Sequence, residues 1–223
     1  MQRFLLLALA FPLLAGFTNQ GPVLPLPKKL LTVPVILQTE DFSCGDVAAL
    51  SILRYWHPET WNKVKEAALY TPLKTSSKAG TDPQPIADFL SRQPGLKAEY
   101  VRGARVEHLE QAVDRGEPAI VNIQAWQAVP RAKDLKAWAT DWIDGHYVVL
   151  IGYDRGNFYF MDPSTQGHYT YVPRGQLSDR WHDVVGDQNV HTQHIVIFVR
   201  STLPRPKPAR PTQPSKTKVT IIN

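Results

Sequence analysis

The stretch LQTEDFSCGDVAALSIL, residues 37–53, holds the one cysteine of this 223-residue chain, Cys44. Gln38 stands six positions before it, and the apolar positions after it predict a mostly buried helix that ends at His57-Pro58. Two interpretations are open at this point. Cys44 is either a small buried hydrophobic side chain or a nucleophile at the start of a helix, with Gln38 beside it.

The two ends of the chain differ from its middle. Arg3, followed by the uncharged apolar run from Phe4 to Ala15, is typical of a signal peptide, because the run is shorter than the ~20 residues that span a bilayer. We expect residues 1–18 to be a signal peptide, either cleaved near residues 15–19 or kept as an uncleaved anchor, and the protein to be exported to the periplasm or the cell exterior. Residues 204–223 are rich in proline and cations and contain no acid, which predicts a disordered basic tail.

The middle of the chain, residues 19–203, has the size of one domain. Without Arg3 and the five tail cations, the 25 basic residues of the chain fall to 19, against 20 acidic ones. This part is therefore near neutral, and its composition gives no support to nucleic-acid binding. A single cysteine in an exported chain cannot form an intrachain disulfide, which favours a free reactive thiol or an intermolecular pair. We expect a monomer.

Hydrophobic periodicity predicts helices first and an antiparallel sheet last, which is an α+β fold. A short strand is expected near residues 33–37 and another over 97–102, and "AIVNIQAW", residues 119–126, is expected to be a central strand. Helices are expected over residues 44–56, 61–70, 81–94 and 106–116. Four strand-like runs follow over residues 146–154, 157–162, 168–173 and 194–200. The segment RWHDVVGDQNVHTQH, residues 180–194, is expected to be a structural loop.

Residues 146–162 read as a hairpin that brings two polar residues together. His146 opens the first strand and Asp162 closes the second, with the turn near residues 155–157. Because the start of one hairpin strand lies beside the end of the other, the two side chains are expected to be neighbours. A carboxylate in that position holds an imidazole in the tautomer that acid–base catalysis needs. His146 is therefore the preferred partner for Cys44 among the seven histidines.

Acyl transfer by a thiol makes two further demands. The nucleophile is the thiolate, which a helix N-terminus and a neighbouring imidazolium both favour. The developing oxyanion needs hydrogen-bond donors, for which the backbone N–H of Cys44 and the side-chain amide of Gln38 are candidates. Four residues then have four roles: Cys44 as nucleophile, His146 as general base and acid, Asp162 as the residue that orients the imidazole, and Gln38 as oxyanion donor.

The stretches QTEDFSCGDVAAL (38–50) and GHYVVLIGYDRGNFYFMDPS (145–164) together resemble the C39 family of papain-like cysteine peptidases, the group that contains the bacteriocin-processing peptidase domains. The resemblance covers residues 33 to 200 or so. It implies a papain-like fold in which N-terminal helices carrying the nucleophile pack on a C-terminal antiparallel sheet. It also implies the same four roles and a peptide or protein substrate. We expect no cofactor and no metal.

The sequence departs from known relatives in two ways. The Cys-Gly-Ser-Cys-Trp motif of the cathepsin type is absent from the sequence, and we expect no membrane-spanning transporter to be fused to the domain. Processing of leader peptides at a double glycine therefore does not carry over. Trp126, Trp142 and Gly145 are candidate substrate-binding residues, and the two tryptophans could form an aromatic wall together with Trp138.

One segment of the sequence raises the alternative of a metal site. His182, Asp183, His191 and His194 lie close in sequence, but zinc needs three or four convergent ligands, and nothing in their spacing fixes convergence. Three functions remain open: a peptidase that hydrolyses a peptide bond, an acyltransferase or transpeptidase that uses the same site, and a catalytically silent peptide-binding module. The intact set of four residues favours the peptidase.

Overall fold

The computed structural model describes residues 27, 30–126, 136–165, 169–186, 189–202 and 219–222. The signal peptide predicted for residues 1–18 and the tail residues 204–218 lie outside these ranges. Across the described ranges, no helix combines the length and the apolar character that crossing a membrane requires.

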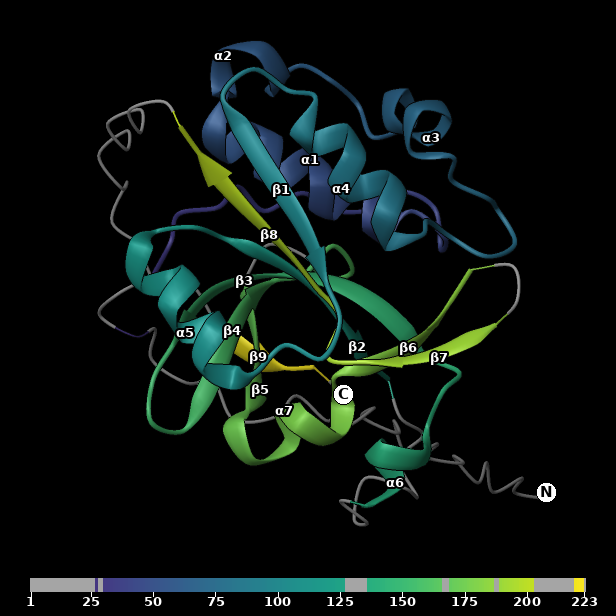
Figure 1. The fold of residues 1–223 in the computed structure, drawn as a ribbon, viewed down its shortest axis with the longest axis vertical. Helices are drawn as coiled ribbons and strands as arrows, with labels where there is room; N and C mark the ends of the chain where they lie inside the picture. Colours follow the sequence, from purple (N-terminus) through teal and green to yellow (C-terminus); the bar gives the residue numbers. More distant parts are fainter. Residues whose placement is uncertain are drawn as a thin grey trace, which may run out of the picture.

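Most strands of the described residues belong to one sheet. All the strands of these residues are β1 (Leu96–Val101), β2 (Ala119–Gln124), β3 (Gly145–Tyr153), β4 (Asn157–Met161), β5 (Tyr169–Pro173), β6 (His182–Val185), β7 (Val190–Gln193), β8 (Val196–Ser201) and β9 (Val219–Ile221). The main sheet has the order β1-β8-β2-β3-β4-β5-β9, and only its last pair is parallel. β6 and β7 form a separate hairpin that projects from one side of the sheet (Figure 1).

Helices cover both faces of this sheet. They are α1 (Cys44–Trp56), α2 (Pro58–Trp61), α3 (Ala67–Leu73), α4 (Pro83–Ser91), α5 (Val106–Arg115), α6 (Lys136–Thr140) and α7 (Arg174–Arg180). Figure 1 shows α1 to α4 together on one side of the sheet, with α5 and α7 on the other. α5 ends as predicted at Gly116, whose φ of +76° is accessible to a residue without a Cβ.

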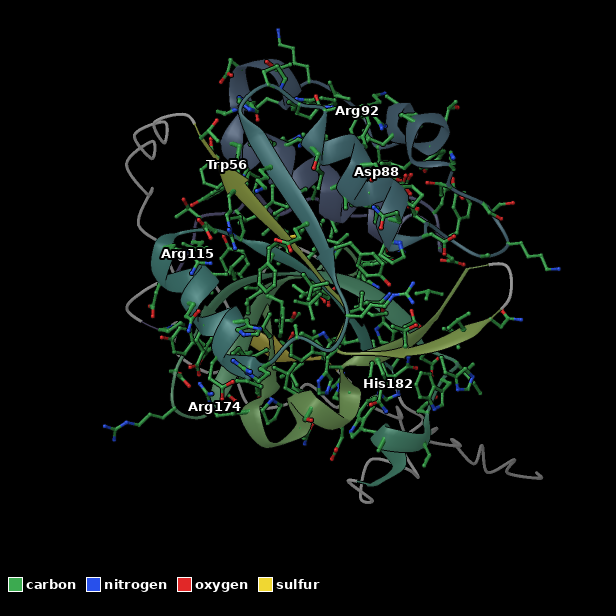
Figure 2. All side chains as sticks on the ribbon, in the orientation of Figure 1. Trp56, Asp88, Arg92, Arg115, Arg174 and His182 are labelled. Atoms are coloured by element: carbon green, nitrogen blue, oxygen red, sulfur yellow. The ribbon has the colours of Figure 1, made fainter. Side chains whose placement is uncertain are left out.

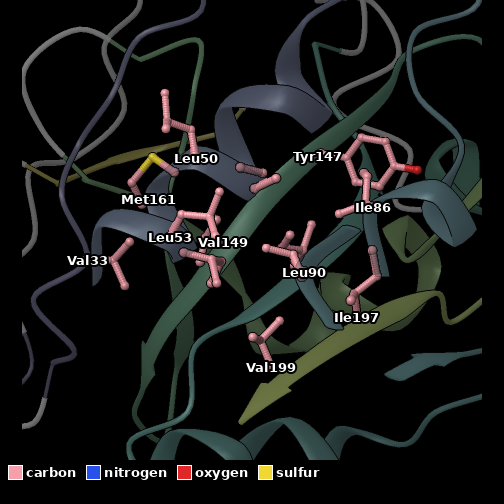
Figure 3. Close-up of a cluster of buried hydrophobic side chains, with 14 of the residues drawn as sticks. Val33, Leu50, Leu53, Ile86, Leu90, Tyr147, Val149, Met161, Ile197 and Val199 are labelled. Atoms are coloured by element: carbon pink, nitrogen blue, oxygen red, sulfur yellow. The ribbon is translucent and has the colours of Figure 1, made fainter. Parts of the chain in front are cut away.

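The core has two layers, one on each face of the sheet. Successive side chains of β3 point to opposite faces, so Tyr147 and Val149 join the layer under α1 and α4, while Val148 and Leu150 join the layer under α5 and α7. Burial of both faces explains why this strand is an almost continuous apolar run. Figure 3 shows the first layer, with side chains that include Leu50, Leu53, Ile86, Leu90, Val149, Ile197 and Val199.

Helices combined with a large sheet confirm the predicted α+β class. Two local predictions are wrong. Residues 33–37 belong to no strand, and Pro34 has no N–H to offer a ladder. Residues 180–194 are not a loop, because β6 and β7 pair there in antiparallel register.

The helix predicted over residues 61–70 is also wrong, because α2 and α3 occupy its two ends. The side chain of Arg54 explains the break between them. Its Nε donates to the carbonyl of Trp61 at 3.2 Å, and its Nη2 donates to the carbonyl of Val64 at 2.8 Å. The Val64 carbonyl therefore bonds to a side chain of α1 instead of to a helical N–H group. The Trp61 carbonyl accepts both from Arg54 and from the Val64 N–H, three residues on, at 3.1 Å.

The end of the chain adds a strand from a segment that was predicted to be disordered. β9 lies beside β5, and the Ile222 N–H donates to the Tyr171 carbonyl at 3.1 Å. The buried Arg180 donates from Nη1 to the Ile222 carbonyl at 2.8 Å. The disordered tail predicted for residues 204–223 is therefore wrong for residues 219–222, whose β-branched run suits a strand.

Candidate active site

A buried histidine–aspartate pair lies where β3 begins and β4 has just ended. His146 Nε2 is 2.8 Å from Asp162 Oδ1, and each side chain is 1% exposed. The strand register explains this proximity, because Val149 pairs with Met161 and the start of β3 therefore lies beside the residues that follow β4. The neighbourhood predicted from the hairpin is confirmed.

The loop after β4 holds the carboxylate in place. The backbone N–H and the Oγ of Ser164 donate to Asp162 Oδ1 at 2.8 and 2.7 Å, and Thr165 Oγ1 donates to Oδ2 at 2.9 Å. Both oxygens are therefore engaged, and Oδ1 stays turned toward the imidazole. Sequence reasoning missed these two residues, although an aspartate that bonds the backbone two positions on is a known turn signal.

The charges of this pair stabilise each other. Burial alone would lower the pKa of His146, but the charge of Asp162 and its hydrogen bond, followed by a hydrogen bond and charge from Cys44, raise it from 6.5 to about 10. Burial alone would raise the pKa of Asp162, but the charge and hydrogen bond of His146 and the bonds from Ser164 lower it from 3.8 to about 2. At neutral pH the pair is therefore an imidazolium and a carboxylate.

Cys44 is the first residue of α1, and its side chain is partly buried. Its contribution to the raised pKa of His146 places the sulfur next to the imidazole. The first N–H groups of a helix have no intrahelical partner and form the positive end of its dipole. The sulfur therefore lies both at a helix start and beside an imidazole. Sulfur, imidazole and carboxylate thus meet in one place, from α1, β3 and the end of β4.

Gln38 lies beside this group, although its side chain faces the turn before α1. The Gln38 backbone N–H donates to the Pro163 carbonyl at 2.9 Å. Its side-chain Nε2 donates to the carbonyls of Glu40 at 2.9 Å and Asp41 at 3.4 Å, and its buried Oε1 has no hydrogen-bond partner among the described residues. One N–H of the amide would have to turn away from these carbonyls to serve a substrate oxyanion.

Of the tryptophans singled out in the sequence, Trp126 lies against the imidazole. Its ring centre is 4.5 Å from that of His146, and its side chain is 45% exposed. The N–H of the preceding residue, Ala125, donates to the Asp144 carbonyl at 2.9 Å, which fixes the segment after β2 beside the start of β3. An aromatic face there shields one side of the imidazolium and leaves a surface that a peptide can contact.

The other two tryptophans pack elsewhere, so the three rings do not form one wall. Trp142 lies with its ring centre 4.2 Å from those of His182 and His191, on the β6–β7 hairpin. Figure 2 labels His182 at the start of that hairpin. Trp138 is buried with its ring 3.9 Å from the guanidinium carbon of Arg180.

Gly145 precedes the histidine, and a carboxylate fills the space where a side chain would be. An ideal Cβ at this position would clash with both carboxylate oxygens of Asp183. Asp183 Oδ1 is held by the Val184 N–H at 2.7 Å and by Gln124 Nε2 at 3.3 Å, so it is not free to move aside. Because Gly145 has no side chain, Asp183 of β6 can pack against the start of β3.

Gly145→Ala is expected to lower the free energy of unfolding by about 1–3 kcal/mol, the usual range for overpacking at a filled site. Urea denaturation measures this. Gly175→Ala is the matched control, because nothing lies within 4 Å of its added Cβ. In an Asp183→Ala background the cost of Gly145→Ala should nearly vanish, and an unchanged cost there would contradict this account of the contact.

Two of the histidines between residues 182 and 194 contact different groups. His182 Nε2 is 2.5 Å from the Asp141 carbonyl oxygen, and His194 stacks on Trp181 with ring centres 4.9 Å apart. Within the described part of the chain, no group of three histidine, cysteine, aspartate or glutamate side chains is placed to hold a metal ion.

Comparison with solved structures bears on the fold. A structure described as that of a C39-like peptidase from Bacillus anthracis superposes with a TM-score of 0.55 and 18% sequence identity, covering 78% of this chain and all of that one. A double glycine motif protease from an AMS/PCAT transporter, in complex with the leader peptide, gives a TM-score of 0.51 and 20% identity, covering 80% of this chain and 98% of that one. These likenesses confirm the papain-like α+β fold.

Comparison of sequences bears on the family. No curated protein matches this sequence. The model of the Peptidase_C39 like family matches residues 30–188, which contain Cys44, His146 and Asp162. The match extends over well more than half of the chain, and it includes residues 38–50 and 145–164, which carry the resemblance. The chain therefore belongs to the Peptidase_C39 like family and is a cysteine peptidase.

Proposed function

We propose that this protein is an exported peptidase that hydrolyses a peptide bond with Cys44 as nucleophile, His146 as general acid and base, and Asp162 as the residue that orients the imidazole. The observation that carries the proposal is the buried His146–Asp162 pair, 2.8 Å apart, whose imidazole also interacts with Cys44 at the start of α1. Packing alone does not require a histidine to have both a buried carboxylate and a thiol as neighbours.

In the first half of the reaction, Cys44 Sγ forms a bond to the carbonyl carbon of the substrate, and the carbonyl electron pair moves onto oxygen. When the carbonyl re-forms, the carbon–nitrogen bond breaks and the His146 imidazolium gives its proton to the departing amine. The products of this half are a free amine and an acyl group in thioester linkage to Cys44. The imidazole is then neutral and ready to accept a proton.

In the second half, a water molecule loses a proton to His146 and attacks the thioester carbon. The sulfur leaves as thiolate, and the acid product departs, which restores the starting imidazolium–thiolate pair. In both halves the negative oxygen needs donors, for which the Cys44 backbone N–H at the helix start and the Gln38 amide are the candidates. Gln38 can supply its donor by rotating one N–H away from the Glu40 carbonyl.

Incubation of the purified protein with a mixture of peptides tests this proposal. We expect cleavage products with free carboxyl ends, and complete loss of cleavage after treatment with iodoacetamide. The signal peptide is tested separately. When the protein is expressed with its own N-terminus, the exported chain should begin between residues 16 and 20. With glycinamide added, hydrolysis products should still dominate. Amide adducts as the main products would show an acyltransferase instead, and intact peptides would contradict catalysis.

A further inference from the structure

A buried carboxylate contacts the turn formed by residues 39–43. Glu66 is the residue directly before α3, and it is 6% exposed. Its Oε1 lies within hydrogen-bonding distance of four groups: the Thr39 N–H at 2.9 Å, Thr39 Oγ1 at 2.5 Å, Ser43 Oγ at 3.0 Å and Tyr70 Oη at 2.9 Å. Burying a carboxylate is costly unless hydrogen-bond donors compensate it, and these groups are placed to do so. The question is what the fold gains from a carboxylate at this position.

The two turn residues that Glu66 holds are next to the proposed oxyanion donors. Thr39 directly follows Gln38, and Ser43 directly precedes Cys44. Inside the turn, the Glu40 carbonyl accepts from Gln38 Nε2 at 2.9 Å and from the Ser43 N–H at 3.2 Å. The Ser43 hydroxyl shares its one proton between Glu66 Oε1 at 3.0 Å and the Glu40 carbonyl at 2.9 Å. One carboxylate oxygen therefore contacts both ends of the segment that separates the Gln38 amide from the Cys44 N–H.

We propose that Glu66 is a positioning residue, which sets the spacing between the Gln38 amide and the Cys44 backbone N–H and so shapes the oxyanion site. This inference rests on the proposed function. Donors stabilise a developing oxyanion only when they are held in place before the reaction. Without Glu66 the Thr39 N–H and hydroxyl lose their acceptor, and the turn is free to adopt other conformations.

The inference separates two reactions of the same sulfur. Hydrolysis passes through an oxyanion, whereas alkylation by iodoacetamide needs the thiolate but forms no oxyanion. Glu66→Ala is therefore expected to lower kcat by about 10–100-fold, less than the ~10²–10³-fold cost of deleting an oxyanion donor itself, with little change in KM. The alkylation rate of Cys44 at pH 6 should stay close to that of the parent. Glu66→Gln keeps an acceptor oxygen and should lose less activity.

A double-mutant cycle links Glu66 to Gln38. If Glu66 acts through the amide, Gln38→Ala and Glu66→Ala should each lower kcat, and the double variant should lose little beyond the larger single effect. Equal parent and Glu66→Ala values of kcat would overturn the inference, and so would fully additive losses in the double variant. Loss of alkylation in step with hydrolysis would show a merely structural role and would overturn it too.

A control and a second measurement keep the result clear of folding effects. Tyr159→Phe removes a 2.6 Å bond to Asp154 at the far end of the β3–β4 hairpin, so it should lower stability without changing kcat. Amide hydrogen exchange needs no turnover. In Glu66→Gln and Glu66→Ala, exchange over residues 39–44 should accelerate while the rest of α1 keeps its protection. Unchanged exchange there would overturn the inference even if the parent protein hydrolysed no peptide.

Discussion

Cys44→Ala is expected to lower kcat for peptide hydrolysis by about 10⁴-fold or more, because no other group can form the covalent acyl intermediate. The measurement is product formation from a cleaved peptide, followed by mass spectrometry. Alanine removes only the sulfur at a partly buried position, so the fold should persist and the variant should still bind the same peptide. The variant thus separates binding from chemistry.

Cys44→Ser is the matched comparison for this prediction. It keeps the size and polarity of the side chain but replaces the thiolate by a hydroxyl that is much harder to ionise, so its activity should also be close to background. Thermal unfolding of both variants should follow the parent. Hydrolysis by Cys44→Ala at a tenth of the parent rate or more would contradict a thiol mechanism and favour a peptide-binding module.

His146→Asn is expected to lower kcat/KM by about 10³–10⁴-fold, because the same imidazole forms the thiolate pair and delivers the proton to the leaving amine. Asp162→Asn should cause a smaller loss, since it leaves the imidazole in place but removes its charge partner. The pH profile of kcat/KM distinguishes the two roles. The parent should lose activity as His146 deprotonates near its pKa of about 10, and this limb should move to lower pH in Asp162→Asn.

The same pair makes stability depend on pH, with a sign fixed by the direction of each pKa shift. The pKa of His146 is raised in the fold, so its contribution is complete below pH 6.5 and is lost as the pH rises from 6.5 through about 10. The pKa of Asp162 is lowered, so its contribution is complete above pH 3.8 and is lost as the pH falls from 3.8 through about 2. Urea denaturation across this range should show a smaller alkaline loss of stability in His146→Asn than in the parent.

Local patterns were enough to predict the parts of the site that depend on neighbours along the chain. The hairpin of β3 and β4 follows from two apolar runs around a short turn, and it fixes His146 beside Asp162. α1 follows from the apolar positions after Cys44, and its first residue is the cysteine itself. The order of helices and strands then gave the α+β class.

Long-range partners could not be predicted in this way. Glu66 holds the turn before α1 from 27 and 23 positions away, through contacts that no periodicity encodes. Asp183 fills the space beside Gly145 because β6 folds back against β3, which depends on a hairpin that the sequence pattern does not predict. In each case a polar residue in an unremarkable sequence position acquires its role only when distant elements pack.

The last strand illustrates a different error. The prolines and cations of the tail predict disorder, but the run Val219, Thr220, Ile221 and Ile222 that follows them has β-branched side chains, which favour a strand. Its partner, β5, lies far back in the sequence, and Arg180 fixes the end through the Ile222 carbonyl. A disorder prediction from composition should therefore stop where such a run begins.

The chemistry proposed for this molecule depends on the Cys44 sulfur, at the start of α1, lying beside the His146 imidazole of β3. The alkylation rate of the lone thiol by iodoacetamide at pH 6, in the parent and in His146→Asn, tests it most directly. We predict labelling of the parent at least about ten times faster, because an unassisted thiol stays protonated at that pH. Equal rates in the two proteins would mean that the imidazole does not act on the sulfur.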